Sequence, residues 1–178
     1  MIALTSDVAP WLATVTESLV HAVIEAKHLT GETLYRFDQR VVDRIQLEIE
    51  KAQSDIASLI EIDARGRVRI YRAMRLRANL ISSMSPGDGL GESWSFSRLG
   101  AHSYDATGSG DGYSFQATLH PDTIHWPATF AMWSSGVGEC RLMAKADISL
   151  ERIETGAGEL VRPDLIKKLF KVRGRIGH

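Results

Sequence analysis

The sequence predicts an α+β protein, with helices in its N-terminal third and a mostly antiparallel, β-rich remainder. Before residue 62 there is almost no glycine or proline, and apolar residues recur every three or four positions, which is typical of amphipathic helices. After residue 62 the chain has short alternating runs of aromatic or β-branched residues between glycine-dense loops. We therefore expect an N-terminal helical region in residues 1–62, a β-rich core in 63–160 and a basic C-terminal tail in 161–178.

The helical region contains two apolar stripes, in residues 8–26 and 34–59, which predict a helical hairpin. Thr30 and Gly31 lie between the stripes, where they can end the first helix and cap the second. Stripes at this spacing usually form core, so we do not interpret them as a coenzyme groove. No Gly/Ser linker follows the second stripe. We therefore expect the hairpin to pack against the β-rich core and to shape one wall of its cleft.

The remainder of the chain contains four runs with the composition of strands. They are "RVRIYRAMRL" (67–76), "ESWSFS" (92–97), "YSFQATL" (113–119) and "CRLMAKADI" (140–148). The stretch 120–139 is less regular, because Pro127 interrupts any long helix. In the tail, apolar and basic residues predict an amphipathic basic helix that could touch a nucleic acid or an acidic partner.

Composition and missing motifs exclude several classes of function. The formal net charge of −1 gives no overall attraction to nucleic acid or anionic membrane. Cys140 is the one cysteine among 178 residues, which excludes an internal disulfide and a Cys-rich zinc site. The sequence has no phosphate-binding GxxxxGK[ST] loop, no GxGxxG motif and no HExxH pair. No apolar run is long enough to cross a membrane, and the N-terminus lacks a secretory signal, so we expect a soluble, cytoplasmic protein. Because the histidines are scattered and form no HExxH pair, we expect no bound metal.

Polar residues occupy three unfavourable places in the β-rich part. Arg72 interrupts a run that otherwise resembles a buried strand, Ser93 and Ser95 flank a tryptophan, and Glu139 precedes the run "CRLMAKADI". One interpretation of Arg72 is that its side chain reaches the sheet surface and pairs with Asp63 or Glu61. The serines would then be exposed strand residues, and Glu139 an ordinary turn carboxylate.

The order of these three placements resembles the R-S-E signature of ADP-ribosyltransferases. The matching segments are "YRA", "LGESWSFS" and "GECRL", and "IHWPATFAMW" resembles a D-W-x-x-T segment of that family. The resemblance is closest to small transferase-like proteins of phages and bacterial mobile elements, and it covers about residues 67–155. It implies an ADP-ribosyltransferase-like β core, with NAD as the substrate and a protein or a nucleic acid as the acceptor.

The resemblance also implies a role for each residue. Arg72 would bind the pyrophosphate of NAD, because a guanidinium offers bidentate, permanently charged donors. Glu139 would be catalytic, binding a ribose hydroxyl and stabilising positive charge on the anomeric carbon. The S-x-S step of the family favours Ser93 as the serine lining the site, whereas the "WS" alignment favours Ser95, which we prefer as the catalytic one. The candidates for stacking on nicotinamide or adenine are Tyr71, Trp94 and Trp126.

One position departs from the family pattern. Transferases that modify arginine usually carry Glu or Gln two residues before the catalytic glutamate, where this chain has Val137. If Glu139 were instead the first member of such a pair, the second position would be Arg141, which cannot do that work. The acceptor could therefore be another side chain, a nucleobase or water, the last giving NAD glycohydrolase activity. The alternative is a non-catalytic phage accessory or interaction protein on the same fold, whose helical hairpin binds a partner.

Overall fold

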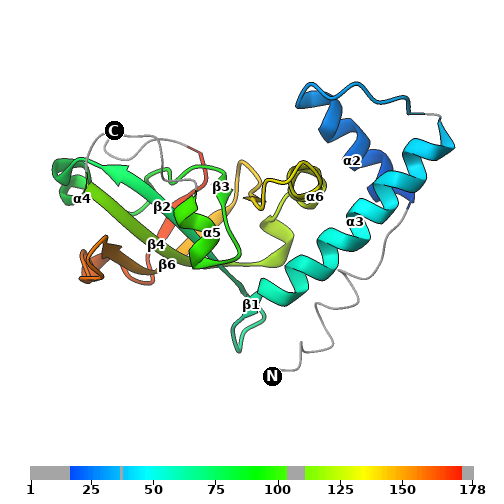
Figure 1. The fold of residues 1–178 in the computed structure, drawn as a ribbon. Coiled ribbons are helices and arrows are strands. Elements are labelled where there is room, and N and C mark those ends of the chain that lie inside the picture. Colours follow the sequence, from blue (N-terminus) through cyan, green and yellow to red (C-terminus); the bar gives the residue numbers. More distant parts are fainter. Residues whose placement is uncertain (1–16, 37, 104–110, 174–178) are drawn as a thin grey trace. The chain divides into compact units, whose positions relative to one another are not determined.

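The computed structural model (Figure 1) describes residues 17–36, 38–103 and 111–173. Its helices and its antiparallel sheet confirm the α+β class. The chain divides into two compact units. One consists of Met1–Leu59 and Trp126–Gly138, and the other of Ile60–His125 and Glu139–His178.

The first unit is helical. It contains α2 (Glu17–Leu29), α3 (Gln39–Leu59) and α6 (Trp126–Ser134), and α6 contacts both other helices. The buried face of α3 is formed by Ile45, Ile49, Ala52 and Ile56, which belong to the second predicted stripe. Residues 8–16 of the first stripe, and Phe37 of the second, lie outside the described residues.

The helix ends differ in part from the sequence prediction. Thr30 ends α2 as expected, because its amide donates to the carbonyl of Ala26 and Gly31 follows with a φ of +92°. The predicted cap of the second helix is wrong. Asp38 caps α3, since its carboxylate accepts from the amide of Arg40 at 2.9 Å. Pro127 does not interrupt a helix but lies in the first turn of α6, where its missing N–H is not needed.

The second unit is built on a five-stranded antiparallel sheet in the order β1-β2-β4-β6-β7. Its strands are β1 (Glu61–Ile62), β2 (Val68–Leu76), β4 (Asp111–Leu119), β6 (Asp147–Thr155) and β7 (Leu169–Lys171). A second sheet pairs β3 (Ser93–Trp94) with β5 (Cys140–Arg141). Short helical turns complete the unit: α4 (Ala78–Ser83), α5 (Arg98–Ser103), η1 (Pro121–Thr123) and η2 (Pro163–Leu165).

The register of the sheet places Arg72 among core residues. Arg72 lies opposite Phe115 of β4, which lies opposite Ile153 of β6, so the three side chains share one face. Phe115 and Ile153 have no exposed surface, and Ile70 on the same side of β2 is also fully buried. The side chain of Arg72 therefore leaves the backbone on the apolar face of the sheet.

The predicted helix in the tail is wrong, because residues of the tail form a strand. β7 pairs with β6. Along this segment, exposed Leu169 and Lys171 alternate with Phe170 and Val172, which are fully buried. This alternation has the period of a strand rather than that of a helix. Lys167 also has a φ of 65°, which a helix cannot contain.

β7 also fixes the glycine loop "SPGDGLGE" (85–92). The amides of Gly87 and Leu90 donate to the carbonyls of Leu169 and Lys171, each at 2.9 Å, and the amide of Lys171 donates to Asp88 at 3.0 Å. Loop and strand therefore form one hydrogen-bonded ribbon, which gives the loop a defined conformation.

Deleting residues 1–30 should destabilise the helical unit, because it removes α2 with the fully buried side chains of Val23 and Ile24. Each such side chain contributes about 1.5–3 kcal/mol, so we expect a large drop in melting temperature or insoluble protein. The matched control deletes residues 1–16 and leaves α2 intact. Equal melting temperatures for the two truncated proteins would show that α2 does not stabilise this unit.

Candidate functional site

Backbone pairing brings the three motif segments side by side. In the smaller sheet, Ser93 lies opposite Arg141 and Trp94 opposite Cys140. Tyr71 and Ser95 exchange two backbone hydrogen bonds of 2.8 Å, which joins β2 to the end of β3. The strand of Arg72, the serine segment and the strand after Glu139 are therefore neighbours.

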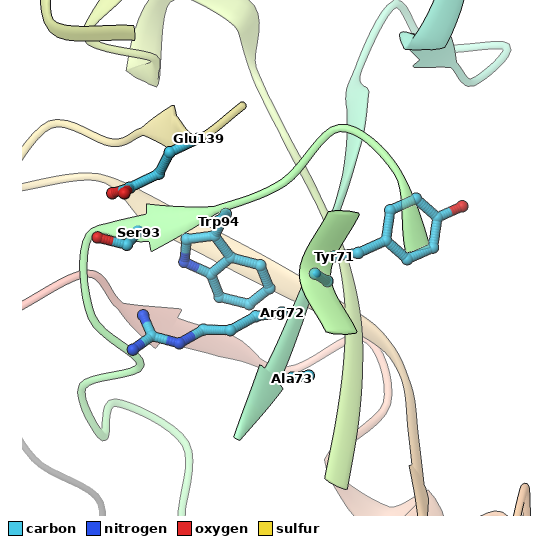
Figure 2. Close-up of a pocket in the computed structure, with 7 residues that line it drawn as sticks. Tyr71, Arg72, Ala73, Ser93, Trp94 and Glu139 are labelled. Atoms are coloured by element: carbon cyan, nitrogen blue, oxygen red, sulfur yellow. The ribbon is translucent and has the colours of Figure 1, made fainter. Parts of the chain in front are cut away.

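Where these segments meet there is a cavity of about 190 Å³. Its lining residues are Tyr71, Arg72, Ala73, Ser93, Trp94, Ala101 and Glu139. Figure 2 shows the polar ends of Arg72, Ser93 and Glu139 pointing to the same side, with the ring of Tyr71 pointing away from them. The cavity therefore presents a guanidinium, a hydroxyl and a carboxylate together.

Arg72 is the least satisfied polar group of this cavity. Its Nη1 atom is buried and has no hydrogen-bond partner among the described residues. Burial lowers the pKa of Arg72, the charge of Glu139 raises it and the charge of Arg141 lowers it again. An arginine nevertheless keeps its charge in proteins. A buried donor without a partner costs about 1–3 kcal/mol, so the position is suited to a ligand with acceptor oxygens.

The sheet-surface interpretation of Arg72 is wrong, because other arginines occupy the two carboxylates it invoked. Asp63 pairs with Arg67 at 2.8 Å, and Glu61 pairs with Arg69 at 2.6 Å. Arg69 lies three residues before Arg72 on β2, so its side chain is on the opposite face of the strand from that of Arg72.

Gly91 allows the guanidinium of Arg72 to lie against the glycine loop. A Cβ atom at this position would be 2.4 Å from Nη1 of Arg72, and the φ of Gly91 is +81°. The indole of Trp94 is 2% exposed, and its Nε1 donates to the carbonyl of Gly91 at 3.0 Å. Trp94 thus holds the loop segment that faces Arg72.

Arg141 connects the serine with the glutamate. Its Nη1 donates to Ser93 Oγ at 2.6 Å and to Glu139 Oε1 at 2.8 Å. The side chain of Glu139 is 13% exposed, so the carboxylate of this ion pair is largely shielded from solvent, whereas Arg141 is partly exposed. Between them, Cys140 is fully buried, and burial raises the pKa of its thiol well above the ordinary value, as does the charge of Glu139. Cys140 is therefore a structural residue rather than a nucleophile.

Of the other candidates named from the sequence, Tyr71 lines the cavity although its ring points away from the polar groups, whereas Ser95 and Trp126 do not line it. Ser95 is 3% exposed, its Oγ accepts from the amide of Ser97 at 3.2 Å, and it is not among the residues that line the cavity. The hydroxyl of Tyr71 donates to Glu61 at 3.0 Å. Trp126 begins α6 of the helical unit and packs on Phe130, with ring centroids 5.8 Å apart.

Sequence reasoning missed the contributions of Gly91 and Arg141. Gly91 belongs to the glycine loop 85–92, and Arg141 to the segment "GECRL" that carries part of the resemblance. The missing information was the pairing across strands, which sets Gly91 against Arg72 and Arg141 against Ser93.

Comparisons with known proteins give no relative, since no family model, curated protein or solved structure matches the chain. Within the described ranges, His, Cys, Asp and Glu form no group of three or more that could hold a metal ion. No helix of the described part is both long and apolar enough to cross a membrane. Function is therefore inferred from the cavity and from the order of the motifs.

Replacing Gly91 by alanine should displace the guanidinium of Arg72 and weaken the binding of pyrophosphate, used as an anionic probe of the cavity, by about tenfold or more for a lost charged hydrogen bond. Gly87 is the matched control, because it lies in the same loop with a φ of +91° but a Cβ there would meet nothing within 4 Å. Both variants should lose about 1–2 kcal/mol of folding free energy through the positive φ, measured by denaturant unfolding. Equal affinities for pyrophosphate in calorimetry would show that the contact between Gly91 and Arg72 is unimportant for anion binding.

Proposed function

We propose that this protein is an NAD-dependent ADP-ribosyltransferase that modifies a protein or nucleic-acid acceptor and hydrolyses NAD when water is the acceptor. The observation that carries the proposal is the meeting of Arg72, Ser93 and Glu139 in one cavity. These residues are far apart in the sequence, and each belongs to a different motif of the R-S-E signature. An accidental resemblance between three short segments gives no reason for them to meet.

The proposed binding mode follows from the unsatisfied guanidinium. Arg72 offers a buried, charged donor, which suits the oxygens of a pyrophosphate. At about 190 Å³ the cavity is smaller than the roughly 300–1,000 Å³ that encloses a drug-sized ligand. It would hold one end of the dinucleotide, the nicotinamide and its ribose, beside Ser93 and Glu139. The pyrophosphate would lie at the Arg72 side of the cavity, and the adenosine would lie outside it.

In the proposed reaction, the bond between the anomeric carbon of the ribose and the nicotinamide nitrogen breaks. Its electron pair stays on that nitrogen, which neutralises the pyridinium ring, and positive charge develops on the ribose. The carboxylate of Glu139 stabilises this charge in a partly dehydrated site. The acceptor then forms a bond to the anomeric carbon and loses its proton to Glu139 or to solvent. Nicotinamide and the ADP-ribosylated acceptor are the products.

A second candidate is the non-catalytic phage accessory or interaction protein on the same fold. The observation that favours it is the ion pair with Arg141, which occupies one oxygen of Glu139. Labelled NAD incubated with the protein and a whole-cell lysate separates the two candidates. Transfer of label to a lysate component, or release of nicotinamide, supports the enzyme, and neither is expected of an interaction protein.

Substituting Glu139→Gln should reduce nicotinamide release by about 100-fold or more, because it removes the charge that faces the oxocarbenium-like ribose. The amide oxygen can still accept the bond from Arg141, so the melting temperature should stay unchanged. Glu159→Gln is the matched control, with the same loss of charge at an exposed position. Unchanged turnover in Glu139→Gln would remove Glu139 from the catalytic role.

Substituting Arg72→Lys should weaken NAD binding by about tenfold or more, since an ammonium cannot make the bidentate contact. The matched control is Arg69→Lys on the same strand, where the guanidinium bonds to Glu61 and Glu151 instead. Calorimetric titration with NAD gives both affinities. If Arg72→Lys and wild type bind NAD equally, Arg72 is not part of the binding site.

A further inference from the structure

We propose that Arg141 is a positioning residue of this site, which holds Glu139 and Ser93 in one fixed arrangement. The inference rests on the proposed function. Its basis is that one nitrogen, Nη1 of Arg141, donates both to Ser93 Oγ at 2.6 Å and to Glu139 Oε1 at 2.8 Å. Arg141 itself is not one of the residues lining the cavity, so it acts through the other two.

The backbone sets up this arrangement before any ligand binds. Ser93 and Arg141 are direct partners across the β3–β5 ladder, which brings their side chains within reach of each other. Glu139 lies two residues before Arg141, so in an extended segment both side chains point to the same side. All three polar groups are therefore placed on one face of the small sheet.

A chain of ion pairs orients the guanidinium. Its Nε lies 3.7 Å from Oε2 of Glu92, whose other oxygen accepts from Nε of Arg173 at 3.1 Å. Arg141 thus uses Nε toward Glu92 and Nη1 toward Glu139 and Ser93. A lysine has one nitrogen and cannot serve both directions at once, so the planar fork of an arginine suits this position better.

The ion pairs add little to folding stability but matter for geometry. Arg173 and Arg141 are 71% and 39% exposed in their side chains, and exposed ion pairs contribute only about 0–1 kcal/mol each. A carboxylate that is free to rotate would spend part of its time facing away from the ribose. A misplacement of about 1 Å at a reacting centre can lower a rate about 100-fold. The effect of Arg141 is therefore expected in turnover and not in stability.

The test compares kcat and KM for NAD turnover of the full chain and its Arg141→Gln variant. We expect kcat to fall about 100-fold, with KM changed by less than about threefold, because the donors that bind NAD remain. Arg141→Lys should recover part of kcat, since it keeps the charge beside Glu139. Arg67→Gln, which breaks an ion pair with Asp63 outside the cavity, is the control and should behave as wild type.

A double-mutant cycle separates positioning from a general structural role. If Arg141 acts through Ser93, the combined Ser93→Ala and Arg141→Gln variant should lose less than the product of the two single losses. Losses that multiply, an unchanged kcat in Arg141→Gln, or a rise in KM without a fall in kcat would each overturn the inference while leaving the proposed function intact. A wild-type protein that turns over no NAD would overturn both the inference and the proposed function. This measurement on the wild type comes before any variant is made.

Discussion

The two backbone hydrogen bonds between Tyr71 and Ser95 are the constraint on which the candidate site depends. β3 and β5 have two residues each, too few to be stable alone. The hydrogen bonds between Ser95 and Tyr71 attach β3 to the long strand β2. β5 is attached to the same strand indirectly, through its pairing with β3. The positions of the side chains at the cavity therefore depend on a backbone pairing between Tyr71 and Ser95, which are 24 residues apart in the sequence.

Charge is distributed unevenly around this frame. Glu139 is engaged by Arg141, and Glu92 by both Arg141 and Arg173. Arg72, in contrast, has a buried nitrogen without a partner in the described part of the chain. Folding tolerates such a group only where the surrounding structure enforces it, and these places are often functional sites. The local excess of positive charge suits an anionic ligand, as a dinucleotide would be.

The sequence allowed the fold class and the outline of the site to be predicted, because both depend on local patterns. Three-to-four spacing identified α3, and the arginine in an apolar run singled out Arg72. What could not be predicted depends on contacts between distant segments. The tail forms β7 because β6 offers an edge to pair with. Ser95 lies opposite Tyr71, whose ring points away from the polar groups of the cavity, and of the two serines only Ser93 lines the cavity.

The glycine loop can take its final conformation only after β7 has been synthesised, because β7 supplies its hydrogen-bond partners. A ribosome synthesises Arg72 and Gly91 roughly 80 to 100 residues before Leu169 and Lys171, which give the loop its hydrogen-bond partners. During that interval the nascent chain carries the arginine without the loop conformation that faces it. If the proposed NAD-dependent activity is correct, the site would stay incomplete on the ribosome until β7 has paired with the sheet.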